Sequence, residues 1–118
     1  MRVIVAGATG WTNESSIRRE LSNLSPGTII IHGDSTGADE IGGRIARELG
    51  FPVEAMAKNT DDRQKYGRLA WKGLNERMLA TGASLVLAFH ADIRSSKGTR
   101  HLVGLAKDLG IEVSLFNG

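Results

Sequence analysis

Two kinds of hydrophobic pattern alternate along the chain. Short, unbroken apolar runs rich in β-branched residues are typical of strands buried on both faces of a sheet. Between them, apolar residues recur at spacings of three and four, as on one face of a helix. The runs predict strands at residues 2–6, 28–31, 51–57, 84–89 and 111–116. The periodic segments predict helices at residues 14–24, 38–49, 68–81 and 99–109.

This alternation of strand and helix predicts the architecture. Parallel strands need crossover connections, and helical crossovers cover both faces of the sheet. We therefore expect an α/β fold, a Rossmann-like three-layer αβα sandwich with a mostly parallel sheet of about five strands. The length of 118 residues suits a single domain over residues 1–118. The segment 58–67 is polar and aperiodic, so we expect a mobile flap there.

Composition narrows the function classes. Cysteine is absent, which excludes disulfides, thiolate catalysis and Cys-ligated zinc. No apolar stretch approaches the roughly 20 residues of a membrane span, and the first strand begins at once rather than after a signal peptide. We therefore expect a cytoplasmic protein. Its 15 basic and 13 acidic residues are mixed along the chain, which disfavours nucleic acid as a partner.

Glycine-bearing loops follow three of the predicted strands and precede helices. They lie at residues 7–12, 32–39 and 95–99. Glycine lets the backbone approach a ligand closely, and the helix behind each loop offers unpaired N–H groups and a positive dipole end. Because the carboxyl ends of parallel strands share one edge of a sheet, the loops predict a common site for a phosphate-bearing small molecule.

Each loop also has a purely structural interpretation. Gly7-x-x-Gly10 is not the dinucleotide-binding G-x-G-x-x-G, and no P-loop motif occurs, so the first loop can be a tight turn alone. In the second loop, Asp39 either caps the helix or accepts hydrogen bonds from sugar hydroxyls. In the third, Lys97 and Thr99 either bind phosphate or are a solvent-exposed lysine and a helix cap.

Side chains outside the loops add candidates. Trp11 and Trp71 can stack on a base or pack in the core, and Arg77 can clamp a phosphate or lie on the surface. No histidine pair has metal-ligand spacing, so we expect no metal and no cofactor. The residues expected at the ligand are Gly7, Thr9, Gly10, Trp11, His32, Gly33, Asp34, Ser35, Thr36, Gly37, Ala38, Asp39, Asn75, Arg77, His90, Asp92, Lys97, Gly98 and Thr99.

The order of several motifs carries a family resemblance. They are Gly7 with Trp11-Thr12, His32-Gly33-x-x-x-Gly37-Ala38-Asp39, Asn75-x-Arg77-Met78-Leu79, Leu87-Ala88-Phe89-His90-x-Asp92-Ile93 and Ser96-Lys97-Gly98-Thr99. Together they resemble the SLOG superfamily, specifically its small YspA/YpsA-related family, over nearly the whole chain. The resemblance implies a Rossmann-like sheet that binds nucleotides or nucleotide-derived ligands, often in dimers. The Lonely Guy phosphoribohydrolases, which cut the N-glycosidic bond of nucleoside monophosphates, and the DNA-binding Rossmann-like domain of DprA are more distantly similar.

The chain departs from the phosphoribohydrolases at a position that matters for catalysis. Those enzymes carry P-G-G-x-G-T-x-x-E, whereas here Gly98-Thr99 is followed by Leu102 in place of the glutamate. The small family often has arginines where this chain has Thr9 and Leu74. The resemblance therefore implies a site that binds better than it hydrolyses and suits a monophosphate better than a di- or triphosphate.

We expect a bacterial or phage protein that binds a nucleoside monophosphate or an ADP-ribose-like molecule, as a sensor, a sequestering protein or an accessory factor. Whether it is an enzyme stays open, and no catalytic residue is assigned. The alternative is an N-glycosidic hydrolase or transferase in which Asp34, Asp39, Glu76 or Asp92 replaces the missing glutamate. A single-stranded nucleic-acid module is the third interpretation.

Assembly is predicted from the helix expected at residues 68–81. One apolar stripe of this helix can face the sheet while Leu69, Trp71 or Leu79 faces a partner. We therefore expect a homodimer or a higher homo-oligomer.

Overall fold

Five parallel strands form the centre of the structure. The computed structural model describes residues 1–118. The strands are β1 (Arg2–Gly7), β2 (Ile29–His32), β3 (Val53–Ala55), β4 (Leu85–Phe89) and β5 (Glu112–Phe116). They lie in the order β3-β2-β1-β4-β5, and every neighbouring pair is parallel. The prediction of an α/β fold is confirmed, with a sheet that is parallel throughout.

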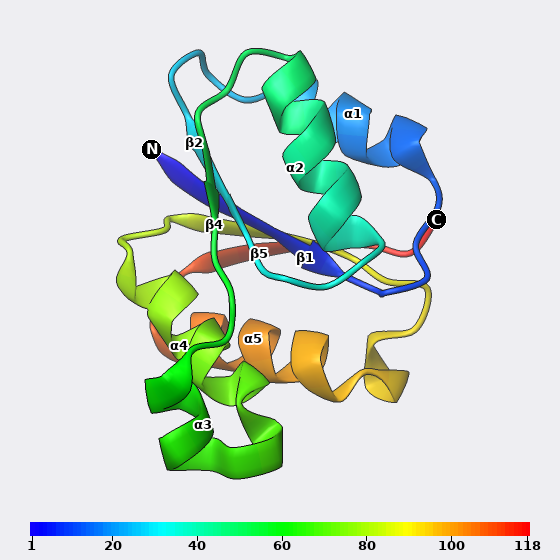
Figure 1. Ribbon diagram of the computed structural model, residues 1–118. Coiled ribbons are helices and arrows are strands. Elements are labelled where there is room, and N and C mark those ends of the chain that lie inside the picture. The colour runs from blue at the N-terminus through cyan, green and yellow to red at the C-terminus, as the bar shows by residue number, and fades with distance from the viewer.

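Helices cover both faces of this sheet. α1 (Glu14–Ser22) and α2 (Ala38–Glu48) lie on one face, and α4 (Trp71–Ala80) and α5 (Lys97–Asp108) on the other (Figure 1). The chain moves outward from β1 to β3, then returns to β4 on the far side of β1 and continues to β5. Because such crossovers are right-handed, reversing direction along the sheet puts the later helices on the opposite face. The predicted three-layer sandwich is confirmed.

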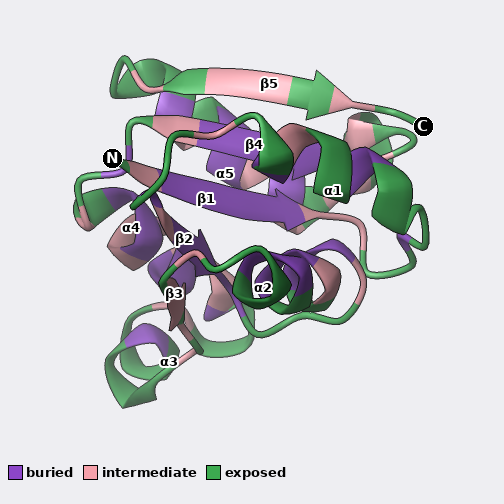
Figure 2. Cartoon of the chain, turned by 90° about the horizontal axis from the view of Figure 1, so that it is seen from above, coloured by how far each residue is buried: buried purple, intermediate pink, exposed green.

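The central strand shows why the strands are apolar at every position. Val3 and Val5 belong to the core beneath α1 and α2, whereas Ile4 and Ala6 belong to the core beneath α4 and α5. All four side chains are buried, as the colouring of β1 in Figure 2 shows. Successive strand residues point to opposite faces, so a strand covered on both sides needs apolar residues throughout.

The expectation of an irregular flap at residues 58–67 was wrong, because most of this segment is the helix α3 (Thr60–Tyr66). Its N-terminus is a capping box. The side chain of Asn59 accepts from the N–H of Asp62 at 2.9 Å, and the carboxylate of Asp62 accepts from the N–H of Asn59 at 3.0 Å. This short helix is held by its cap and by ion pairs rather than by an apolar face, so its sequence shows no apolar periodicity.

The bounds of three other elements also differ from expectation. β3 is shorter than residues 51–57, and Gly67–Leu69 is a 3₁₀ turn before α4. α5 begins at Lys97 because Ser96 is its cap: the Ser96 hydroxyl accepts from the N–H of Thr99 at 3.2 Å. Thr99 is therefore not the cap.

One side chain expected at a subunit interface is in the core. Leu79, on α4, is 4% exposed and packs in the core between the sheet and helices α4 and α5, whereas Leu69 is 43% exposed. The homo-oligomer stays a prediction, and the exposed apolar surface of this region is Leu69 with part of Trp71.

Helix α2 lies close to the sheet because two of its residues lack side chains. A Cβ atom at Gly42 would meet Val5 Cγ1 at 2.5 Å, and one at Gly43 would collide with the imidazole of His32. That ring is 9% exposed and its Nδ1 lies 2.8 Å from the Gly33 carbonyl oxygen, so it has little room to move.

We therefore expect Gly43→Ala to lower the free energy of unfolding by about 1–3 kcal/mol, the usual cost of overpacking. The matched control is Gly104→Ala on α5, where a Cβ would meet no atom within 4 Å. This control should raise stability by about 0.5–1 kcal/mol, since alanine favours a helix over glycine. Chemical denaturation followed by circular dichroism measures both, and equal stability of Gly43→Ala and wild type would contradict the close packing.

Candidate functional site

A cleft of about 280 Å³ opens at the carboxyl edge of the sheet. It lies where the strand order reverses, since the chain leaves β1 toward one face and β4 toward the other. Ligands of open α/β sheets bind at this position. The cleft is lined by Ala6, Gly7, Thr9, Gly33, Asp34, Ser35, Asp39, Lys58, Trp71, Leu74, Asn75, Met78, Ser96, Lys97, Gly98, Thr99 and Leu102.

Gly7 lets the first loop cross the end of β4 closely. Its φ is +150°, and a Cβ atom there would collide with the carbonyl of Phe89. The next N–H, that of Ala8, donates to the same carbonyl oxygen at 2.8 Å. The glycine therefore serves a tight backbone contact and lines the cleft at the same time.

The second loop places the N-terminus of α2 behind the cleft. Gly37 has a φ of +72°, and a Cβ atom there would collide with the carbonyls of Ala8 and Thr9. The N–H of Ala38 donates to the Ala8 carbonyl at 3.1 Å, and the Thr36 hydroxyl donates to the Thr9 carbonyl at 3.1 Å. The positive end of α2 thus faces carbonyl oxygens of the first loop, and Gly37 and Ala38 do not line the cleft.

The third loop presents an open helix N-terminus. Only the N–H of Thr99 is capped by the Ser96 hydroxyl, and neither Lys97 nor Gly98 donates its N–H to another protein atom. Both residues line the cleft. Unpaired N–H groups and the positive dipole end make this start of α5 suited to an anion.

Two carboxylates of the second loop line the cleft in different states. Asp34 lies 2.7 Å from Lys58 Nζ and also accepts from the Lys58 N–H, and these bonds outweigh partial burial to lower its pKa. Asp39 is 8% exposed and accepts from the N–H of Ser35 at 3.3 Å. Burial raises the pKa of Asp39 to about 7 although this N–H opposes the shift. Gly37, not Asp39, occupies the cap position of α2.

Asn75 joins the wall of the cleft to the third loop. Its side-chain amide donates to the Gly98 carbonyl at 3.1 Å and lies 3.1 Å from Nδ1 of His101. An amide nitrogen can only donate, so His101 accepts on Nδ1 and keeps its proton on Nε2. Asn75 therefore positions the start of α5.

Several predicted residues lie away from the cleft. Trp11 is buried with its ring 5.7 Å from that of Phe89, and its Nε1 donates to the Asn13 carbonyl at 3.0 Å. His32 lies beneath Gly43 on α2. The residues of the predicted set that do not line the cleft are Gly10, Trp11, His32, Thr36, Gly37, Ala38, Arg77, His90 and Asp92. His90 and Asp92 line a separate depression beside Phe116.

Arg77 holds α3 instead of reaching the cleft. Its guanidinium donates to both carboxylate oxygens of Asp62, at 3.1 and 2.6 Å, and to the carbonyl of Ala57 at 2.6 Å. Asp62 is 4% exposed whereas the Arg77 side chain is 34% exposed, so the carboxylate is the buried partner of this pair. Arg77 is thus engaged by Asp62 and Ala57 outside the cleft, and its role as a phosphate clamp stays a prediction.

Sequence reasoning missed some of the lining. Lys58 lies in the segment taken as a flap, and its partner Asp34 is distant in sequence. The pairing of β3 with β2 brings the ends of these strands together, which is the signal that could have placed Lys58 near Asp34. Leu74, Met78 and Leu102 were not among the residues expected at the ligand, yet they form the apolar wall of the cleft.

Two further features of the structure bear on function. No group of three or more His, Cys, Asp or Glu side chains is arranged to hold a metal ion. None of the helices has both the length and the apolar character needed to span a bilayer.

Two comparisons with known proteins show the family of this chain. The model of the YspA, cpYpsA-related SLOG family matches residues 1–62, from β1 into α3. The Gene 61 protein of Mycobacterium phage D29 is 32% identical over 122 residues, which cover 98% of this chain and 95% of the phage protein. The chain belongs to the YspA/cpYpsA-related SLOG family. Membership in this SLOG family implies nucleotide-related ligand binding in general. No solved structure matches the chain.

The pKa of Asp39 predicts how stability depends on pH. The folded-state pKa of about 7 exceeds the ordinary value of about 3.9, so the folded protein binds the extra proton between these values. The stability contribution of Asp39 is therefore fully present below about pH 4 and lost as the pH rises through about 7.

We expect the stability of wild type relative to Asp39→Asn to fall over this range. The fall should be on the order of 1.4 kcal/mol for each unit by which the pKa is displaced. Urea denaturation at several pH values measures it, with Asp108→Asn at the exposed end of α5 as the control. A difference between wild type and Asp39→Asn that does not change with pH would contradict the raised pKa.

Proposed function

We propose that the cleft binds a nucleoside monophosphate or an ADP-ribose-like molecule, and that the protein acts as a sensor, a sequestering protein or an accessory factor. The observation that carries this proposal is the open N-terminus of α5 at the point where the strand order reverses. The SLOG family supports the class of ligand, and the residues of the cleft support the smaller members of that class.

The phosphate would bind at the start of α5. The N–H groups of Lys97 and Gly98 are unpaired there, and the side chain of Lys97 adds a positive charge. Lys58 is the other cation of the cleft, and Asp34 already pairs with it. With a single unpaired cation, the cleft suits one phosphate group better than a triphosphate.

The sugar would lie toward the second loop. Asp39 lines the cleft and has its pKa near neutrality, so its carboxyl group can either accept a hydrogen bond from a ribose hydroxyl or donate one. The base would pack on the apolar wall of Leu74, Met78 and Leu102. Apolar walls with a few placed polar groups are typical of small-molecule sites.

Cleft blocking tests this proposal. A Cβ at Gly98 would meet no atom within 4 Å, so Gly98→Leu should fold and fill the cleft beside the α5 terminus. We expect wild type to bind AMP in isothermal titration calorimetry and Gly98→Leu to lose at least tenfold in affinity, about 1.4 kcal/mol. Gly104→Leu, on the same helix but outside the cleft, is equally unhindered and should bind like wild type. Equal affinity of the two variants would refute the placement of the ligand.

One observation favours a second function, an N-glycosidic hydrolase or transferase. Asp34 has a lowered pKa and Asp39 a raised one, and both line the same cleft. Two carboxyl groups whose pKa values are shifted in opposite directions can serve as base and acid. Against this, Asp34 is already bonded to Lys58.

We expect binding without turnover. Leu102 is 1% exposed and apolar, so it cannot stabilise positive charge at an anomeric carbon. The absence of a carboxylate at position 102 costs several kcal/mol of transition-state stabilisation, on the order of a thousandfold in rate. Wild type should therefore release no free base from AMP, GMP or their deoxy forms above background, as measured by chromatography. Robust release would favour the hydrolase, and activity should then disappear in Asp34→Asn or Asp39→Asn.

A further inference from the structure

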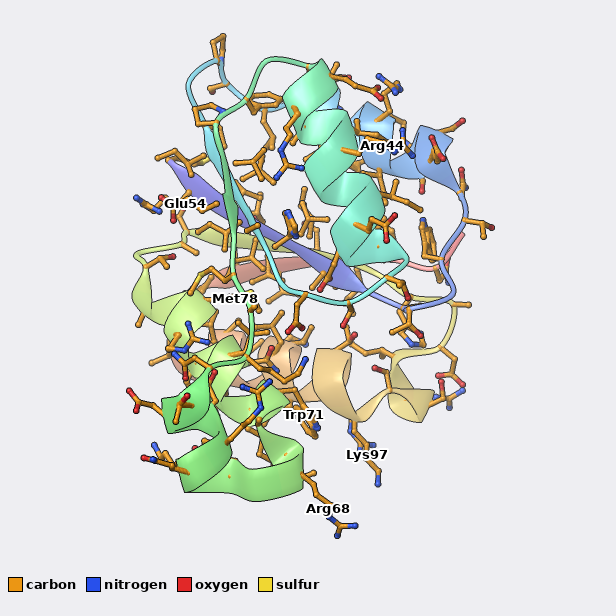
Figure 3. The ribbon with its side chains drawn as sticks, in the orientation of Figure 1. Arg44, Glu54, Arg68, Trp71, Met78 and Lys97 are labelled. Carbon is orange, nitrogen blue, oxygen red and sulfur yellow. The ribbon has the colours of Figure 1, made fainter.

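A second hollow adjoins the cleft on the side of α4 and α5. It measures about 390 Å³ and is lined by Leu69, Trp71, Lys72, Lys97, Arg100 and His101. Trp71 and Lys97 line the cleft as well, so the two spaces meet around these residues. Figure 3 shows Trp71 beside the start of α5, with Lys97 and Arg68 projecting into solvent at the same end of the molecule.

The cations of this hollow are not neutralised by carboxylates. Arg2, Arg18, Arg44, Lys58 and Arg77 all form ion pairs elsewhere in the structure. No ion pair involves Lys72, Lys97 or Arg100, and no acidic residue lines the hollow. The net charge of the chain is only +2, so an overall basic composition does not account for this concentration of positive charge.

The hollow also has an aromatic component. The Trp71 ring meets His101 edge to face at a centroid distance of 5.4 Å, and Lys72 Nζ lies 5.8 Å from the Trp71 centroid. Burial, aided by the charge of Lys72, lowers the pKa of His101. The positive charge at neutral pH therefore comes from Lys72, Lys97 and Arg100 around the half-buried Trp71.

Size favours a ligand that uses both spaces. The cleft alone, at about 280 Å³, is slightly smaller than typical ligand pockets of roughly 300–1,000 Å³. The cleft and the hollow together fall well within that range. A ring or sugar passing Trp71, with an anionic group on each side, matches the chemistry of both spaces.

We propose that the ligand extends from the cleft past Trp71 and places a second phosphate group between Lys72 and Arg100. The ligand class is then a nucleotide derivative with two phosphate groups separated by at least a ribose. This inference rests on the proposed function, because the first phosphate group occupies the start of α5 in the cleft. The second group is bound by side chains at the rim.

Titration calorimetry with three probes tests the inference. AMP carries one phosphate group, whereas adenosine 3′,5′-bisphosphate and 5′-phosphorylated diadenylate carry two on either side of one ribose, the second being a terminal phosphate in the former and a phosphodiester in the latter. At low salt, at least one of the longer probes should bind about tenfold or more tightly than AMP, as expected for a charge-assisted contact. The gain should largely vanish near 1 M salt, where the Debye length falls to about 3 Å.

Charge-neutral variants locate the second phosphate group. Lys72→Gln/Arg100→Gln should remove the gain of the longer probe and leave AMP affinity unchanged. Arg47→Gln/Lys107→Gln is the matched control, since it removes two charges at exposed positions outside the cleft and the hollow. This control should retain the gain.

The outcomes separate this inference from the proposed function. If AMP binds but neither longer probe binds more tightly, or the gain survives Lys72→Gln/Arg100→Gln, the inference is overturned and the cleft assignment stands. If no probe binds, AMP included, both fail. If an oligothymidylate binds more tightly than the dinucleotide and keeps its affinity in Gly98→Leu, the hollow is instead a nucleic-acid surface independent of the cleft.

Discussion

The loop after β1 is held between its neighbours by two backbone contacts that only glycine permits. Gly7 rests against the Phe89 carbonyl at the end of β4, and Gly37 rests against the carbonyls of Ala8 and Thr9. Any side chain at either position would separate these backbones, and the positive φ at both disfavours other residues. The edge of the sheet that carries the cleft depends on these contacts.

This packing makes the two helix N-termini at the carboxyl edge unequal. At the start of α2 the N–H of Ala38 is bonded to the Ala8 carbonyl, whereas at the start of α5 the N–H groups of Lys97 and Gly98 are free beside the cleft. A helix terminus binds an anion only if its N–H groups are open to it. The ligand is therefore proposed to lie nearer α4 and α5 than α1 and α2.

The cationic side chains likewise differ in whether they have partners within the protein. Arg77 and Lys58 are used internally, to anchor α3 and to hold Asp34. Lys72, Lys97 and Arg100, which have no carboxylate partner, line the hollow beyond Trp71. A small net charge thus coexists with one locally cationic surface next to the cleft, and the proposed extended ligand follows from that coexistence.

The sequence determined the layers and the approximate position of the cleft. Continuous apolar runs and helical periodicity reflect burial directly. Strands such as β1, and helices covering both faces of the sheet, were therefore predictable. Strand-end glycines such as Gly7 and Gly33 line the cleft, because parallel strands bring their carboxyl ends to one edge, and their contact with a ligand stays a prediction.

Tertiary structure alone decided which polar side chains reach the cleft. Arg77 forms an ion pair with Asp62, and Lys58 forms one with Asp34, although the partners are well separated in sequence. No local pattern encodes such a pairing. From the sequence alone, Trp11 suits a base-stacking position as well as it suits the core. In the structure its ring packs against that of Phe89. Periodicity reports which face of an element is buried, whereas the partner of a long polar side chain depends on the distances between elements, which only packing sets.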